Sequence, residues 1–330
     1  MPRLPRRPAW LRREPDVAVP PPSAAAGREP RILATRGAPM PFSKGRMAQA
    51  LVLAGADPER AYQIAMRIER EVKATPADEI PIDQLHAMVE DLLAREEGPD
   101  LVSRYHGWRE VLRLDRPLML LIGGATGTGK STLATEIAYR LGISRITSTD
   151  VIRQAMRAFF AEELMPELHY SSFDAAEGLK IPLPDPDDED RALYGFIQQA
   201  GQVAVGANAV VERAVLEGLS TVVEGVHLVP GLVSAHQHAG AVVVQAMLAI
   251  TDEETHQGHF FFRDIASGGV RSMDRYLRSF GEIRRIQDYL LARAEKESWP
   301  VIEAGEPDQA LIAVMDLILE RATARQSAVP

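Results

Sequence analysis

From residue 117 onward, the chain alternates short apolar runs with longer segments whose apolar positions recur at helical spacing. The first run, residues 118–122, is wholly apolar, as expected for a strand buried on both faces of a parallel sheet. Strands that alternate with helices are typical of an α/β domain with a mostly parallel sheet flanked by helices. The pattern predicts further strands at 145–147, 220–225, 241–250 and 300–302.

Helical spacing fills most of the intervals between these strands. The segment 162–190 breaks the pattern, because it contains a proline-rich acidic stretch and reads as one long loop. A loop of this length is a candidate functional element. The predicted helices of this part of the chain lie at 130–141, 150–160, 191–218, 276–296 and 307–323, with another after the capping residues 251–254.

The first third of the chain has a different organisation. Residues 1–30 are rich in proline and predict a disordered arm. Residues 31–97 predict a small helical domain, in which Ser43 and Asp57 precede helices as N-caps. Residues 98–116 form a predicted connector into the second domain, which we place at 117–330.

Composition narrows the possible functions. The 330 residues carry a net charge of −9, so the molecule as a whole does not attract nucleic acid or anionic membranes. There is no cysteine, which excludes disulfides, thiolate nucleophiles and cysteine-ligated metals. We expect a cytoplasmic protein, since no apolar run of about 18 residues and no secretory h-region occurs. Composition leaves the oligomeric state open.

A glycine-rich loop follows the first apolar run and opens the helix predicted at 130–141. Its spacing, Gly-x4-Gly-Lys-Ser between a strand and a helix, is that of a phosphate-binding P-loop. Glycines let peptide N–H groups face an anion, and the helix start adds unpaired donors. The lysine would reach the β- and γ-phosphates of ATP as a catalytic residue, and the serine hydroxyl would ligate Mg²⁺. The predicted phosphate-binding residues are Gly124, Ala125, Thr126, Gly127, Thr128, Gly129, Lys130, Ser131 and Thr132.

Asp150 follows the second predicted strand directly. Because ligands of open α/β sheets bind beyond the carboxyl ends of strands, we expect this carboxylate beside the γ-phosphate. It can orient or deprotonate an acceptor hydroxyl there, or hold Mg²⁺ through water; a helix N-cap is the alternative. Arg153 lies three residues on and can grip an anionic acceptor with two hydrogen bonds, unless it belongs to a solvated helix face.

Glu224 ends the third predicted strand, where a carboxylate can hold Mg²⁺ or the water in its shell. His227 is close by and is a candidate for substrate contact, although a single histidine is commonly a structural residue. His256 and His259 lie on the helix after the fourth strand, but as a metal cluster they lack further ligands.

Arginines gather on the segment that follows. Arg263, Arg271 and Arg275 flank the glycine pair at 268–269, which can hinge a lid. Arginines on such a lid would bind the substrate and stabilise the charge of transferring phosphates. A basic, solvated surface is the alternative interpretation.

Taken together, these segments resemble the 2-phosphoglycerate kinase family, in matching order over about residues 40–305. The run Glu-Gly-Val-His-Leu-Val-Pro-Gly at 224–231 is much more specific than the P-loop, which very many families share. The N-terminal unit is similar to an ATP-cone domain. The segments that carry the resemblance are 123–132, 148–153, 223–231 and 283–290, and for the ATP-cone 41–45 and 61–65.

The resemblance implies a P-loop kinase domain that uses ATP and Mg²⁺ to convert 2-phosphoglycerate into 2,3-bisphosphoglycerate. The ATP-cone-like domain would be either a regulatory nucleotide site or a docking module without ligand. Two other functions stay open: a kinase for another small phosphorylated or polyol acceptor, and a non-catalytic ATP-sensing regulatory protein. The expected partner is a small anionic metabolite, and neither nucleic acid nor membrane is expected.

Overall fold

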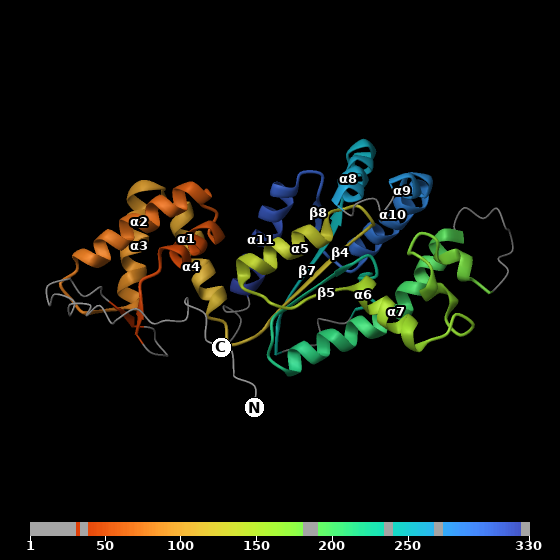
Figure 1. Ribbon diagram of the computed structural model, residues 1–330, viewed down its shortest axis with the longest axis horizontal. Helices are drawn as coiled ribbons and strands as arrows, with labels where there is room; N and C mark the ends of the chain where they lie inside the picture. The colour runs from red at the N-terminus through yellow and green to blue at the C-terminus, as the bar shows by residue number, and fades with distance from the viewer. Residues whose placement is uncertain (1–30, 34–38, 181–190, 234–239, 267–272, 325–330) are drawn as a thin grey trace, which may run out of the picture.

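The computed structural model describes residues 31–33, 39–180, 191–233, 240–266 and 273–324, with the backbone alone at 262–266. An N-terminal unit of helices with a small sheet lies beside a larger unit built around a parallel sheet (Figure 1). The predicted arm at 1–30 and the acidic stretch at 181–190 lie outside the described residues. None of the described helices has both the length and the apolar character needed to cross a bilayer.

The N-terminal unit contains four helices among its described residues: α1 (Lys44–Leu53), α2 (Pro58–Ala74), α3 (Ile82–Glu96) and α4 (Pro99–Leu112). It also contains a sheet, in the order β2-β1-β3, formed by β1 (Arg31–Leu33), β2 (Met40–Pro41) and β3 (Glu79–Pro81). The sheet adds to the helical unit predicted from the sequence. Strands of two or three residues leave no periodic pattern from which they could be predicted.

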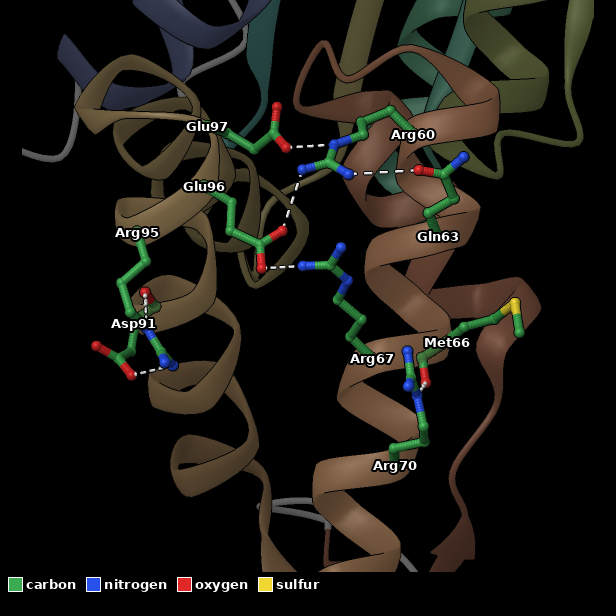
Figure 2. A network of polar contacts seen from close by, with 9 residues as sticks. All are labelled: Arg60, Gln63, Met66, Arg67, Arg70, Asp91, Arg95, Glu96 and Glu97. Carbon is green, nitrogen blue, oxygen red and sulfur yellow. Dashed lines mark hydrogen bonds and ion pairs between the residues drawn. The ribbon is translucent and has the colours of Figure 1, made fainter.

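Capping and ion pairs order the helices of this unit. Asp57 accepts hydrogen bonds from the N–H groups of Glu59 and Arg60, which confirms it as the N-cap of α2. Arg60 on α2 then binds both Glu96 and Glu97 at the end of α3, at 3.0 and 2.5 Å (Figure 2). These side chains are partly exposed, so the pairs orient the two helices more than they stabilise them.

The larger unit is organised by five described strands: β4 (Leu118–Gly124), β5 (Ile146–Ser148), β6 (Thr221–Gly225), β7 (Val242–Ala249) and β8 (Val301–Glu303). They pair in parallel in the order β5-β6-β4-β7-β8, so the first strand of this unit is the central one. Each lies where the sequence predicts a strand. Parallel neighbours need long crossover connections, which are usually helical, and this accounts for the alternating pattern of the chain.

Helices cover both faces of this sheet. Leu120 of β4 belongs to the core shared with α5 (Lys130–Leu141) and α11 (Pro307–Ala324), and Leu121 belongs to the core shared with α7 (Arg191–Leu216) and α10 (Phe280–Lys296). Both side chains are fully buried, which explains why β4 is apolar on both faces. The remaining described helices are α6 (Thr149–Phe159), α8 (Glu253–Ala266) and α9 (Met273–Arg278).

Two segments differ from the predicted elements. The helix expected at 276–296 is divided, because α9 ends at Arg278 and α10 begins at Phe280. The loop expected at 162–190 contains the short 3-10 helices η2 (Pro166–His169) and η3 (Ala175–Gly178) in its described part. Both 3-10 helices pack on α7, and η2 also packs on α6.

The two units share one apolar core through α4 and α11. Tyr105 and Trp108 of α4 are almost completely buried, and α4 packs along α11. Arg104 of α4 donates to the carbonyl of Ala54 at 2.8 Å and pairs with Asp316 of α11. Because α4 contacts both units, the predicted boundary after residue 97 stays a prediction.

Two glycines of α7 offer a test of how closely η3 approaches it. A Cβ at Gly195 would lie 2.2 Å from the Ala176 nitrogen, whereas one at Gly201 would meet no described atom within 4 Å. We expect Gly195→Ala to lower the free energy of unfolding by about 1–3 kcal/mol, because backbone must move. Gly201→Ala should raise it by about 0.5–1 kcal/mol through the lower entropy cost of alanine. Urea unfolding measures both, and equal effects would contradict this packing.

Candidate active site

The phosphate loop joins the central strand β4 to the start of α5. Gly127 and Gly129 have φ angles of 92° and 77°, which residues with side chains rarely adopt. Gly129 is also the N-cap of α5, so the loop ends where unpaired helix N–H groups begin. Residues 126–132 line a cleft of about 1500 Å³. This arrangement is suited to binding anionic phosphates.

Lys130 brings a positive charge into this loop. The residue is 8% exposed, and its Nζ donates to the carbonyl oxygen of Ala125 at 2.6 Å and contacts Thr128 Oγ1 at 3.4 Å. A buried ammonium group requires such polar partners. The loop therefore holds the lysine ammonium group at the cleft.

Glu224 lies beside the loop because β6 is the neighbour of β4. It pairs with Ile122 in the strand register, and its Oε1 accepts a hydrogen bond of 3.0 Å from Ser131 Oγ. A carboxylate and a hydroxyl are oxygen donors of the kind that Mg²⁺ prefers, usually with phosphate oxygens and waters as the other ligands. No group of three or more histidine and acidic side chains gathers as a metal site among the described residues. The pair therefore fits a metal held jointly with a nucleotide.

Asp150 lies in the first turn of α6, at the carboxyl end of β5. Ser148, rather than Asp150, is the N-cap, since its hydroxyl accepts from Val151 N at 3.2 Å. The alternative of Asp150 as the cap is therefore wrong. Its side chain is 62% exposed and lines the cleft, 3.5 Å from Arg153 Nε. The carboxylate is thus accessible to an acceptor hydroxyl.

Arg153 is a buried residue and does not belong to a solvated helix face. Its Nη1 donates to the carbonyl oxygens of Leu168 and Tyr170, both at 2.8 Å, while the side chain also lines the cleft. Burial lowers the pKa of Arg153 from its usual value, and the nearby Asp150 opposes that shift. The two carbonyl contacts therefore fix the position of the guanidinium group at the edge of the cleft.

A second wall of the cleft comes from the segment between η2 and η3 and from α9. Ser171, Ser172 and Phe173 line it from the segment between the two 3-10 helices. Arg275 of α9 also lines it, where the guanidinium lies 2.7 Å from Asp174 Oδ2 and 5.5 Å from the Phe173 ring centre. This wall thus combines two serine hydroxyls with an arginine whose guanidinium is paired with Asp174.

Comparison with known proteins agrees with this geometry. A family model described as the ATP cone domain matches residues 30–113. A 2-phosphoglycerate kinase from Methanothermobacter thermautotrophicus is 41% identical over 263 residues, which cover 80% of this chain and 85% of that protein. The corresponding protein of Methanopyrus kandleri is 38% identical, with 93% of each chain covered. The chain belongs to the 2-phosphoglycerate kinase family. The resemblance noted from the sequence is thereby confirmed.

His227 belongs to the run at 224–231 and is not among the side chains that line the cleft. The side chain is fully buried, with Nδ1 at 2.9 Å from Thr149 Oγ1 and Nε2 at 2.9 Å from Gln199 Oε1. Gln199 donates in turn to the carbonyl oxygens of Glu167 and Tyr170. From this position the histidine links the start of α6 to the segment that holds Arg153. The predicted substrate contact stays a prediction.

The lid arginines are described only in part. Arg271 and the side chain of Arg263 lie outside the described residues, so their substrate contacts stay predictions. Sequence reasoning missed Ser171 and Asp174, because they lie in a stretch without any periodic pattern. It also missed that His256 and His259 contact the phosphate loop, at Thr126 O and Gly127 O. The two histidines are three residues apart, which places them on one face of a helix. This spacing is the sequence feature from which a shared contact could have been inferred.

Buried histidines make the stability of the fold depend on pH. Burial lowers the pKa of His227 and of His256 to about 4, whereas an unfolded histidine titrates near 6.5. Between these values the unfolded chain binds more protons, so stability present above pH 6.5 is lost as pH falls towards 4.

We expect the free energy of unfolding to decrease from pH 7 to pH 5, as measured by urea unfolding. His256→Gln keeps a donor and cannot titrate. The free energy of unfolding of this variant should therefore decrease less than that of the wild type between pH 7 and pH 5. A wild-type slope in His256→Gln would contradict the assignment.

Proposed function

We propose that the chain transfers the γ-phosphoryl group of ATP to the free hydroxyl of 2-phosphoglycerate, giving ADP and 2,3-bisphosphoglycerate. The main support is the cleft itself, which places the phosphate loop, Asp150 and Arg153 around one volume. The names of the relatives supply the substrate, since each of those compared is a 2-phosphoglycerate kinase. The residue types fit, because this acceptor carries a carboxylate, a phosphate and a hydroxyl.

On the nucleotide side, the triphosphate would lie along residues 126–132. The cleft continues from the loop towards α11, where Ala304, Pro307 and Leu311 line it. These apolar side chains suit a nucleotide base, while Lys130 reaches the β- and γ-phosphates. Positioning and charge stabilisation supply most of the catalysis in phosphoryl transfer.

On the acceptor side, Asp150 would accept the proton of the attacking hydroxyl. A bond forms between that oxygen and the γ-phosphorus, and the bond to the β–γ bridging oxygen breaks, so that ADP leaves with the electron pair. Arg153 and Arg275 would hold the carboxylate and the phosphate of the acceptor. Nη1 of Arg153 already donates to two carbonyl oxygens, so the other N–H groups of its guanidinium would bind the acceptor.

Ser131 and Glu224 would hold Mg²⁺ in this site. The bound metal neutralises charge on the phosphate oxygens during transfer. Glu224 is 5% exposed, so its carboxylate needs a positive or donating partner in the cleft. The Ser131 hydroxyl supplies one such partner, and the metal would supply the other.

The acceptor assignment is tested by ADP release from ATP and Mg²⁺ with a panel of small acids and polyols. We expect 2-phosphoglycerate to stimulate release more than 3-phosphoglycerate, glycerol 3-phosphate or gluconate. Lys130→Ala should reduce the rate by about 100-fold or more, because the cation no longer meets the transferring group. If another acceptor stimulates ADP release more strongly, that acceptor replaces 2-phosphoglycerate as the proposed substrate. ATP binding without consumption for every acceptor would instead favour the ATP-sensing protein.

The metal site is tested with Glu224→Gln. Loss of the carboxylate charge should raise the Mg²⁺ concentration for half-maximal activity roughly tenfold or more. Glu136→Gln is a matched control, because Glu136 also lines the cleft but pairs with Arg140 at 2.7 Å. A titration of activity against Mg²⁺ at saturating ATP compares the two. Identical curves for both variants would argue against Glu224 as a holder of the metal.

A further inference from the structure

The first turns of α8 lie directly against the phosphate loop. His256 Nε2 is 2.8 Å from the carbonyl oxygen of Thr126, and His259 Nδ1 is 2.9 Å from that of Gly127. The two histidines are three residues apart, so they project from one face of the helix. They therefore contact two successive peptide groups of the loop.

The partners determine which ring nitrogens carry hydrogen. A carbonyl oxygen can only accept, so Nε2 of His256 and Nδ1 of His259 are the donors. The other nitrogen of His256, Nδ1, is buried and has no hydrogen-bond partner among the described residues. A buried ring with one unsatisfied nitrogen costs stability relative to a hydrocarbon ring. A hydrocarbon ring in this position could not form the hydrogen bond to the carbonyl oxygen of Thr126.

Packing keeps α8 in place. A Cβ at Gly127 would lie 2.5 Å from Phe260 Cε1 and 3.0 Å from His256 Nε2. Phe260 is fully buried and stacks on Tyr276 of α9, with the ring centres 5.0 Å apart. Gly127 is therefore needed for the close approach of α8 as well as for the loop conformation.

His259 also lines the cleft, whereas His256 is not among the lining residues. The C=O and N–H of one peptide group point in opposite directions, so a carbonyl held by a histidine fixes the direction of the N–H group that follows it. We propose that His256 and His259 are positioning residues that hold the peptide groups of the phosphate loop in the orientation that binds the nucleotide phosphates. The proposal rests on the proposed function only in taking ATP as the nucleotide.

Amide side chains provide a test, because asparagine places its N–H group where histidine has Nδ1 and glutamine places it near Nε2. His256→Gln and His259→Asn therefore keep the donors, whereas His256→Asn and His259→Gln misplace them. We expect the misplaced donors to weaken binding of a non-hydrolysable ATP analogue with Mg²⁺ about tenfold. The matched variants should stay within about threefold of the wild type. Calorimetry on the full chain, without acceptor, measures these affinities.

The same contrast should appear in KM for ATP and not in KM for the acceptor. Equal affinities within each Asn and Gln pair would overturn the proposal, as would losses confined to thermal stability. If His256→Asn fails to fold, the pair at His259 decides alone, since that residue is partly exposed. Because binding is measured without acceptor, a wrong acceptor assignment leaves the result standing.

Discussion

A loop that binds phosphate through its peptide N–H groups must present its carbonyl oxygens on the outer side, and those oxygens need partners as well. In this protein the partners come from two sources. Lys130 and Thr128 supply them for Ala125 within the loop, while α8 supplies them for Thr126 and Gly127. The position of α8, and of α9 which stacks on it, therefore follows from a requirement of the loop.

Strand order determines what else reaches the loop. Because β6 rather than β5 is the neighbour of β4, Glu224 meets Ser131, and Asp150 lies one strand farther away. That order places the carboxylate proposed to hold the metal next to the phosphate loop, and the proposed base one strand beyond it. In the proposed reaction, residues at the carboxyl ends of β4, β6 and β5 would therefore hold the phosphates, the metal and the acceptor proton, respectively.

Features encoded in one stretch of chain were predictable. The apolar run of β4, the loop after it and the carboxylate at the end of β6 each have a local pattern, and each lies where expected. The bonds of Arg153 to the carbonyls of residues 168 and 170 were not predictable, because they join segments through tertiary packing. For the same reason the small sheet of the N-terminal unit was not predicted. Short strands that pair across more than 40 residues carry no periodic signal.

The shared helix α11 has a thermodynamic consequence. Ala310 and Leu311 line the cleft, while Asp316 pairs with Arg104 of α4 in the N-terminal unit. If a ligand displaced α4 and thereby moved α11, it would alter the free energy of nucleotide binding through the residues with which α11 lines the cleft. By linkage, the nucleotide would alter the affinity of that ligand by the same factor. The two ligands would not need to touch each other, because both would act on the position of α11.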